Sequence, residues 1–227
     1  MTVSMLLAID TATRYASLAL HDGARVRVEL SWESPDHHTV ELTPRVAGML
    51  SQIETTVDDL VGIAVSLGPG SFTGLRVGVA LAKGLAMARG IKLVGVPTLD
   101  IVARAMQDAR MPLVAILAAG RGRLVAQRYQ WNGNEFVAEG KAWLTKANEL
   151  GLDWQETWCV CGELSADERH ELKKRLGACI ELATPAASLR RAGYLAELGW
   201  ARLRAGHVDD PITLAPIYIQ TPSGSPA

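Results

Sequence analysis

The strongest constraint on the fold of this chain is an order of expected elements that occurs twice along it. In the first half, apolar runs and turn signals predict strands over 5–10, 16–21, 25–32, 60–67 and 92–96, with helices over 40–53 and 72–89. A helix over 99–109 follows. The second half repeats the order, with strands over 113–118, 123–131, 135–143, 157–161 and 178–182 and helices over 145–150, 166–176 and 187–205. Residue identity between the halves is not evident, so the repetition is one of pattern.

Two α/β units that each open with three meandering strands predict the actin-like ATPase fold, with two βββαβα-type halves. The 227 residues are enough for two small domains, each with its own core. We therefore expect an N-terminal half over 1–103 and a C-terminal half over 104–227. The Pro-, Gly- and Ser-rich tail from 221 to 227 is expected to be mobile.

Composition narrows the functional classes. The chain has 23 basic and 24 acidic residues, whereas a protein that binds nucleic acid on its own usually has a basic surplus. If RNA is the substrate, we expect another protein to hold it. An odd number of cysteines argues against a disulfide framework. The N-terminus lacks the pattern of a signal peptide, and no stretch is long and apolar enough for a bilayer, so we expect a cytoplasmic protein without a membrane segment.

The first motif is the turn Asp10-Thr11-Ala12-Thr13 at the end of the first expected strand. In actin-like ATPases the matching turn is typically Asp-x-Gly-Thr, where the Asp approaches a metal through water and the Gly lets backbone N–H groups reach a phosphate. Ala12 occupies the Gly position here, and its methyl group crowds the phosphate path. Two interpretations of this turn remain open. It is either a nucleotide site formed by Asp10 and Thr11, or a relic turn that Asp10 stabilises.

The second motif runs from residue 68 to 76 and joins a strand to a helix. Gly68, Gly70, Ser71 and Thr73 make this loop a candidate anion site, because such loops bind anions at helix N-termini. The motif matches neither of the common glycine-rich phosphate patterns. Ser71 or Thr73 as an N-cap, which contributes about 1 kcal/mol, is the favoured interpretation on physical grounds.

The third feature is a stripe of small residues along the helix expected over 72–89. Its members recur every four residues and are Gly74, Gly78, Ala82 and Ala86. Such a stripe lets another element approach closely, either the chain's own sheet or a partner subunit. For the second alternative, candidate interface residues on the neighbouring helix are Val40, Leu42, Val46 and Met49.

Chemistry-bearing patterns are missing elsewhere in the sequence. Histidines do not occur at the spacing that places two metal ligands on one helix face, and no serine lies in a G-x-S-x-G motif. We therefore assign no catalytic and no metal-ligating residue.

Three segments together resemble the TsaB family in order and spacing, over roughly the first hundred residues. They are Leu7–Thr13, Ser66–Gly78 and Gly95–Leu99, and the second contains the distinctive Gly-Pro-Gly-Ser-Phe-Thr-Gly stretch. The second half fits less well. The family usually has an Asp-Ala-Arg then Gly-Glu pattern in the second meander, whereas residues 118–123 here read Ala-Ala-Gly-Arg-Gly-Arg.

The resemblance implies a non-catalytic subunit of the machinery that forms threonylcarbamoyladenosine in tRNA. Members pair with the catalytic TsaD subunit through helices of the N-terminal domain and work with the ATPase TsaE. They self-associate through the same surface when alone. The resemblance also implies that ATP is used by the complex, that this subunit requires no cofactor, and that tRNA is met only through the complex. The alternative from the residues alone is an independent actin-like ATPase or small-molecule kinase, based on Asp10, Thr11 and the 68–76 loop.

Overall fold

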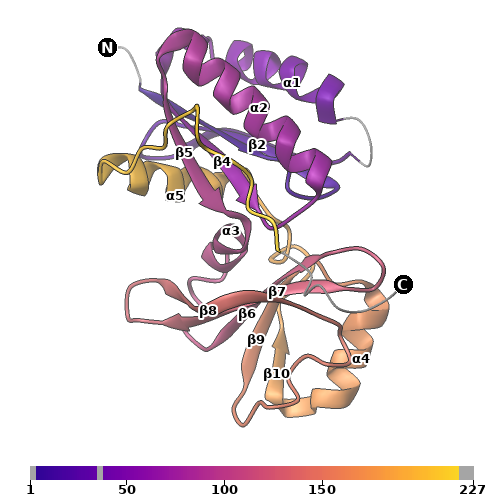
Figure 1. Ribbon diagram of the computed structural model, residues 1–227. Coiled ribbons are helices and arrows are strands. Elements are labelled where there is room, and N and C mark those ends of the chain that lie inside the picture. Colours follow the sequence, from indigo (N-terminus) through magenta and orange to yellow (C-terminus); the bar gives the residue numbers. More distant parts are fainter. Residues whose placement is uncertain (1–3, 35–37, 220–227) are drawn as a thin grey trace. The chain divides into compact units, whose positions relative to one another are not determined.

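The computed structural model describes residues 4–34 and 38–219 (Figure 1). The chain forms two compact units. Unit 1 comprises residues 1–101 and 191–217, and unit 2 comprises 102–190 and 218–227. The break near residue 101 lies close to the expected boundary, but the division into 1–103 and 104–227 does not describe the units, because the chain returns to unit 1 for its last helix. The tail over 221–227, expected to be mobile, lies outside the described residues.

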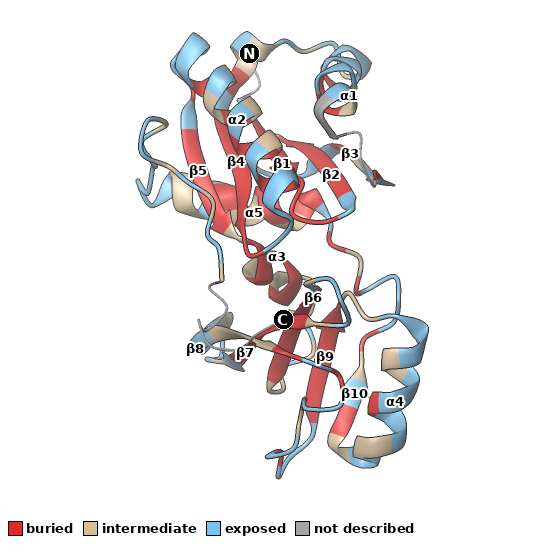
Figure 2. Ribbon diagram, turned by 45° about the vertical axis from the view of Figure 1, so that its right-hand side comes forward, coloured by how far each residue is buried: buried red, intermediate tan, exposed pale blue. Residues whose placement is uncertain are grey.

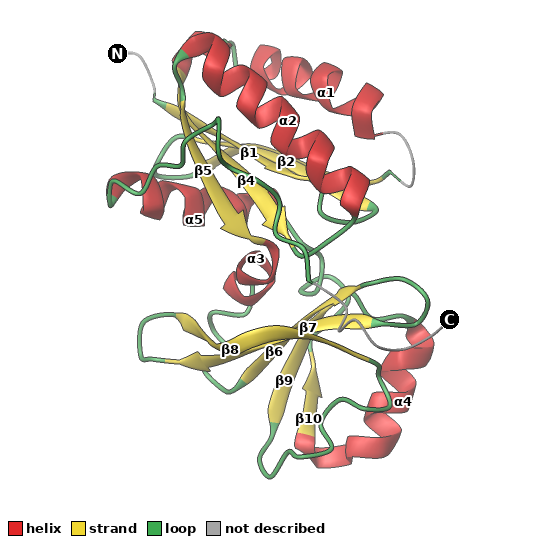
Figure 3. Ribbon diagram, viewed as in Figure 1, coloured by secondary structure: helices red, strands yellow, loops and turns green. Residues whose placement is uncertain are grey.

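Unit 1 is built on a five-stranded sheet with the order β3-β2-β1-β4-β5. The strands are β1 (Met5–Asp10), β2 (Tyr15–His21), β3 (Val26–Glu33), β4 (Leu60–Gly68) and β5 (Lys92–Pro97). β1, β2 and β3 pair antiparallel, whereas β4 runs parallel to β1 and to β5. The helices of unit 1 are α1 (His38–Gln52), α2 (Phe72–Arg89) and α5 (Ala192–Arg204), with a short 3-10 turn at Val57–Asp59 (Figure 3). The helix α3 (Thr98–Arg104) begins in unit 1 and contains the boundary at residue 101.

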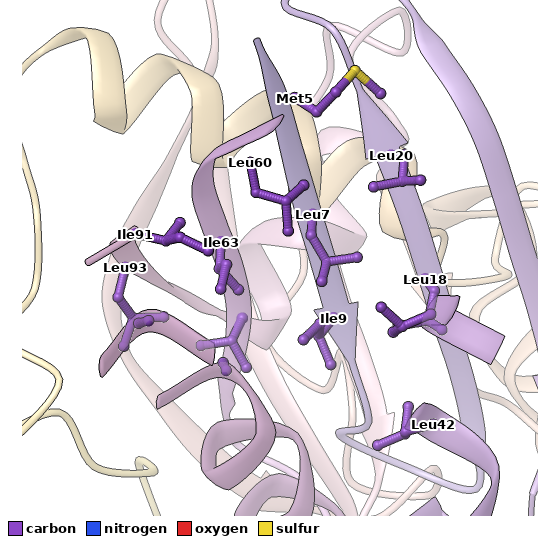
Figure 4. Close-up of a cluster of buried hydrophobic side chains, with 14 of the residues drawn as sticks. Met5, Leu7, Ile9, Leu18, Leu20, Leu42, Leu60, Ile63, Ile91 and Leu93 are labelled. Atoms are coloured by element: carbon purple, nitrogen blue, oxygen red, sulfur yellow. The ribbon is translucent and has the colours of Figure 1, made fainter. Parts of the chain in front are cut away.

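Both faces of this sheet are covered, and the alternation of β1 shows how. Leu7 and Ile9 point into the core on the side of α1 and α2, to which Leu42 of α1 also belongs (Figure 4). Leu6 and Ala8 point the other way, into the core formed with α5. Because all six β1 residues are buried, the strand reads as a continuous apolar run ending in Asp10 (Figure 2). Burying a side chain such as Leu7 stabilises the fold by about 1.5–3 kcal/mol.

Unit 2 repeats this topology. Its strands are β6 (Leu113–Ala118), β7 (Leu124–Trp131), β8 (Phe136–Thr145), β9 (Trp158–Gly162) and β10 (Ile180–Leu182). Their order, β8-β7-β6-β9-β10, is the order of β3-β2-β1-β4-β5 in unit 1. The helix α4 (Ala166–Leu176) is followed by a 3-10 turn at Gly177–Cys179. The predicted repetition of the sheet pattern is therefore confirmed.

The helix expected over 145–150 is absent, and a loop with turns replaces it. The loop brings Ala147, Leu150 and Trp154 into the core of unit 2. The Lys146 carbonyl accepts from the amides of Glu149 and Leu150, and Arg175 donates hydrogen bonds to the carbonyl oxygens of Ala147 and Leu150. The short apolar run in the sequence indicates that this segment is buried, but it does not distinguish a buried loop from a helix.

Two other helices are shorter than predicted. The helix expected over 99–109 ends at Arg104, and i to i+3 turns follow it as far as Arg110, which has a positive φ of 51°. The helix expected over 187–205 begins at Ala192, because Arg191 before it has extended backbone angles. None of the helices in the described part of the chain combines the length and apolarity that crossing a membrane requires.

Candidate partner-binding face

The turn after β1 and the start of α2 are bound directly to each other. The hydroxyl of Thr11 donates a 2.7 Å hydrogen bond to the carbonyl of Gly74, and the amide of Ser71 donates one of 2.6 Å to the carbonyl of Ala12. Gly70 leaves room for this approach, since a Cβ there would lie 2.2 Å from the Ala12 oxygen. Ser71 is the N-cap of α2, and its hydroxyl accepts from the amide of Gly74 at 3.2 Å.

This arrangement favours the structural interpretation of both sequence motifs. Asp10 is fully buried and accepts a 3.0 Å hydrogen bond from the amide of Ala12, so its carboxylate takes part in the turn itself. The Ser71 amide, which an anion at the helix N-terminus would need, is bound to a carbonyl. The amide of Gly68 donates to the hydroxyl of Thr98 at 2.9 Å. Gly70, Ser71 and Thr73 are exposed, whereas Asp10, Thr11 and Gly68 are buried.

The small-residue stripe of α2 faces inward. Gly74, Gly78, Ala82 and Ala86 are all buried, and a Cβ at Gly78 would lie 2.2 Å from the Thr11 hydroxyl oxygen. The stripe is thus the helix-on-sheet contact, the first of the two alternatives.

The interface residues predicted on α1 are also mostly buried in the chain's own core. Leu42, Val46 and Met49 are buried in the core of unit 1, at 1%, 6% and 1% exposure, while Val40 is 67% exposed. Of the eight interface candidates, only Val40 is available to a partner of the folded chain. The apolar residues that recur at helical spacing usually face the core of the same chain, so they are not available to a partner.

The opposite faces of these two helices carry a second set of small residues that sequence reasoning missed. On α2 they are Ala80, Gly84 and Ala88, and on α1 they are Thr43, Ala47 and Ser51. Both sets recur every four residues and are exposed. The sequence contained this information as a second set of small residues with a spacing of four, on a different face of each helix from the buried set.

A groove of about 480 Å³ lies between α1 and α2, which run side by side in Figures 1 and 2. It is lined by Leu42, Thr43, Phe72, Thr73, Arg76, Val77, Ala80 and Leu81. At its mouth the guanidinium of Arg76 lies 3.6 Å from the centre of the exposed Phe72 ring. Large apolar side chains therefore remain in contact with water on this face, which is the usual mark of an interaction surface.

Apart from Arg76 at the mouth of the groove, several charged side chains of the two helices are bound to other groups of the chain. Glu41 accepts a 2.7 Å hydrogen bond from the indole of Trp32, and the Arg45 guanidinium lies over the same ring. Lys83 donates to two carbonyl oxygens of the segment that follows α5. The result is a face with little unpaired charge, as the centre of a protein interface requires.

The grouping and burial of side chains that bind metals or act as thiol nucleophiles bear on any chemistry in the part of the chain that the structure describes. In residues 4–34 and 38–219, no three His, Cys, Asp or Glu side chains form a group that could hold a metal ion. Burial raises the pKa of the Cys159 thiol to about 11 and raises that of Cys161 well above its usual value. Both are core side chains of β9 rather than nucleophiles.

The repeated sheet order, with helices on both faces of the sheet of unit 1, places this chain among the proteins with the actin-like ATPase fold. Residues 33–207 match the family described as "TsaD: tRNA N6-adenosine threonylcarbamoyltransferase". The chain is 33% identical over 159 residues to the Escherichia coli "tRNA threonylcarbamoyladenosine biosynthesis protein TsaB", covering 66% of this chain and 68% of that protein. It is 29% identical to the Bacillus subtilis protein of the same name, covering 92% and 94%.

A crystal structure from Pseudomonas aeruginosa, described as an uncharacterized protein with similarity to peptidase YEAZ, superimposes with a TM-score of 0.80. The two chains are 24% identical, and the match covers 96% of this chain and 100% of that one. The predicted α/β actin-like fold is confirmed, and the chain belongs to the TsaB family.

Proposed function

We propose that this protein is a non-catalytic subunit required for forming threonylcarbamoyladenosine in tRNA, and that it pairs with a TsaD-type catalytic subunit through the outer faces of α1 and α2. The observation that carries the proposal is the exposed groove between these helices, which Phe72 lines, together with the exposed apolar side chains of the same two helices. Val40, Phe72 and Met87 are 67%, 54% and 62% exposed. The names of the relatives, and the family shared with the threonylcarbamoyltransferase, support the reaction.

Close helix packing is the physical basis of the pairing. Ala80 and Gly84 of α2, and Ala47 and Gly48 of α1, leave the backbones of both helices accessible. A Cβ added at Gly48 or Gly84 would meet no atom within 4 Å. Helices of a partner can therefore approach to about 8 Å between axes, at the short end of the usual range. Phe72 and Met87 would then supply the large side chains that dominate interface energies.

The same face accounts for self-association. In the absence of a TsaD-type subunit, two copies of α1 and α2 would cover each other, and the homodimer and the heterodimer would compete for one surface. The TsaE-type ATPase would join the assembled complex, which uses ATP, while this subunit needs no cofactor of its own. tRNA would meet the complex rather than this protein alone.

Size exclusion with light scattering tests the pairing, using this protein alone and mixed with the TsaD-type protein of the same source. We expect a heterodimer to form at the expense of any homodimer. Gly84→Leu should abolish both species. Because the site is open and Leu favours helix more than Gly does, the variant should be no less stable than the wild type.

Ala201→Leu is the matched control, since Ala201 is an exposed residue of α5 on the other side of the sheet. This variant should pair normally. A Gly84→Leu protein that pairs as well as the control would exclude the assigned face. Calorimetry with Mg-ATP on the protein alone tests the cofactor proposal, and binding that Asp10→Ala removes would favour the independent ATPase instead.

A further inference from the structure

The segment that follows α5 is fixed along the edge of the unit 1 sheet. Asp209 forms an isolated antiparallel bridge with Leu93 of β5, which is the last strand in the order of that sheet (Figure 1). The carboxylate of Asp209 also accepts a 2.8 Å hydrogen bond from the amide of Gly95. The segment therefore covers the outer edge of β5, where the backbone of an edge strand would otherwise face water.

Beyond this bridge, a turn over residues 209–214 is held against α2. The ammonium group of Lys83 donates hydrogen bonds of 3.1 and 3.0 Å to the carbonyl oxygens of Ile212 and Leu214. The carboxylate of Asp210 accepts from the amide of Ile212 at 2.8 Å, and its carbonyl oxygen accepts from the amide of Leu214 at 2.9 Å. Leu214 itself packs against the core that includes Val79 of α2. The backbone on both sides of Ile212 is thus fixed in position.

This fixed turn presents one apolar side chain to water. Ile212 is 75% exposed. On α2, Met87 follows Lys83 by four residues, so the two side chains are neighbours on the helix surface, and Met87 is 62% exposed. Apolar residues scattered singly over a surface are common, but adjoining ones mark an interaction surface. Because Lys83 contacts the turn and adjoins Met87, Ile212 and Met87 belong to one apolar patch beside Lys83.

Charged side chains at this patch are already bound within the chain. Lys83 is bound to two carbonyl oxygens of the turn, and the carboxylate of Asp210 is bound to an amide of the same turn. The carboxylate of Asp209 is bound to the amide of Gly95. Since these charges have partners in the free protein, another subunit can cover the patch without leaving them unpaired. Low unpaired charge is the property that the centre of a protein interface requires.

The outer faces of α1 and α2 alone are small for a stable interface. Within the described part of the chain, α1 has seven exposed residues and α2 has eight. A standard interface uses about 20–30 residues on each side. The turn over 209–214 is bound to α2 through Lys83, so a subunit that covers the outer face of α2 gains the missing surface by extending over the turn.

We propose that the turn over 209–214 is part of the surface that binds the TsaD-type subunit, with Ile212 as an anchor that enters an apolar depression of that subunit. The inference rests on the proposed function, because it takes the outer face of α2 as the pairing face and extends it. The turn is already ordered in the free protein, so burying Ile212 there costs little conformational entropy. A large apolar side chain on a fixed backbone is suited to carry much of the binding energy.

Dissociation constants of the heterodimer test the inference, measured by calorimetry with the full chain and the TsaD-type protein of the same source. Ile212→Ala should weaken pairing about tenfold, because less apolar surface is buried. Ile212→Glu should weaken it about a hundredfold or more, because a charge would be buried without a partner. Leu152→Glu is the matched control, since Leu152 is 74% exposed and lies in unit 2, and this variant should pair normally. All three variants should unfold at the urea concentration of the wild type, because both side chains are exposed.

Hydrogen exchange gives a second measurement that needs no substitution. The amides of residues 209–214 should exchange more slowly in the heterodimer than in the free protein. Unchanged exchange there, or an Ile212→Glu protein that pairs as tightly as Leu152→Glu, would overturn the inference. A loss confined to the homodimer would overturn it as well, because a second copy of this chain would then be the occupant. Gly84→Leu separates the two proposals: normal pairing of that variant excludes the face of α1 and α2, whereas normal pairing of Ile212→Glu alone leaves that face standing.

Discussion

Replacing Gly78 by Ala should destabilise the protein, although Ala is the better helix former. The added Cβ would lie 2.2 Å from the hydroxyl oxygen of Thr11, which is fully buried. Thr11 can relieve this overlap only by turning its hydroxyl away, which breaks the 2.7 Å hydrogen bond to the carbonyl of Gly74. Leaving buried polar groups unpaired costs about 3 kcal/mol at most, and the gain in helix propensity offsets about 1 kcal/mol, so we expect a net loss of at most about 2 kcal/mol.

Gly84→Ala is the control on the same helix. No atom lies within 4 Å of the added Cβ, so only the helix propensity acts, and the variant should be about 1 kcal/mol more stable than the wild type. Urea unfolding followed by circular dichroism measures both changes. In a Thr11→Ala background the clash is gone, and Gly78→Ala should then become neutral or stabilising. Equal stability of Gly78→Ala and Gly84→Ala in the wild-type background would refute this account of the contact.

Three further outcomes follow from the burial and bonding of single side chains. Under native conditions a thiol reagent should modify Cys179 at a normal rate, while Cys159 and Cys161 react only on unfolding, because burial raises the pKa of both thiols. Burial lowers the pKa of His21 below its ordinary value of 6.5. The contribution of His21 to stability is therefore complete above pH 6.5 and is lost as the pH falls through the pKa of the folded state. His21→Gln should flatten this part of the curve of unfolding free energy against pH, measured in urea. Lys83→Met removes donors 3.1 and 3.0 Å from two carbonyl oxygens of the segment after α5, so limited proteolysis should cut that segment faster, with a loss of about 1 kcal/mol.

Local patterns predicted most of the fold correctly. The N-cap at Ser71 and the helix that follows it were evident from the residue types alone. The repeated strand order was predicted from turn signals and apolar runs, which depend on neighbours in sequence. The helix predicted over 145–150 was wrong because a short buried apolar run does not distinguish a helix from a loop whose apolar side chains pack into the core.

The candidate site was harder to predict from the sequence because it depends on contacts between residues that are far apart in the chain. Thr11 and Gly74 are separated by 63 residues, and their hydrogen bond joins the buried face of α2 to the turn after β1. The stripes that contain Gly78 and Gly84 consist of small residues at the same spacing, so the spacing alone does not show which stripe faces the sheet. The sequence showed that α2 has a face for close approach, and only the fold assigned that face to the chain's own sheet. The exposed stripe then remains for a partner.

Unit 2 is inserted in the chain between two parts of unit 1, and this order matters while the protein is being synthesised. Leu6 and Ala8 belong to a core that α5 completes, but α5 is made only after the roughly 90 residues of 102–190. At an elongation rate of about 20 residues per second, that face of the first sheet waits on the order of 5 s on the ribosome before α5 emerges. Unit 2 is uninterrupted from residue 102 to 190 and can close while the first sheet is still open. The N-terminal strands, although translated first, are therefore the last to be fully enclosed.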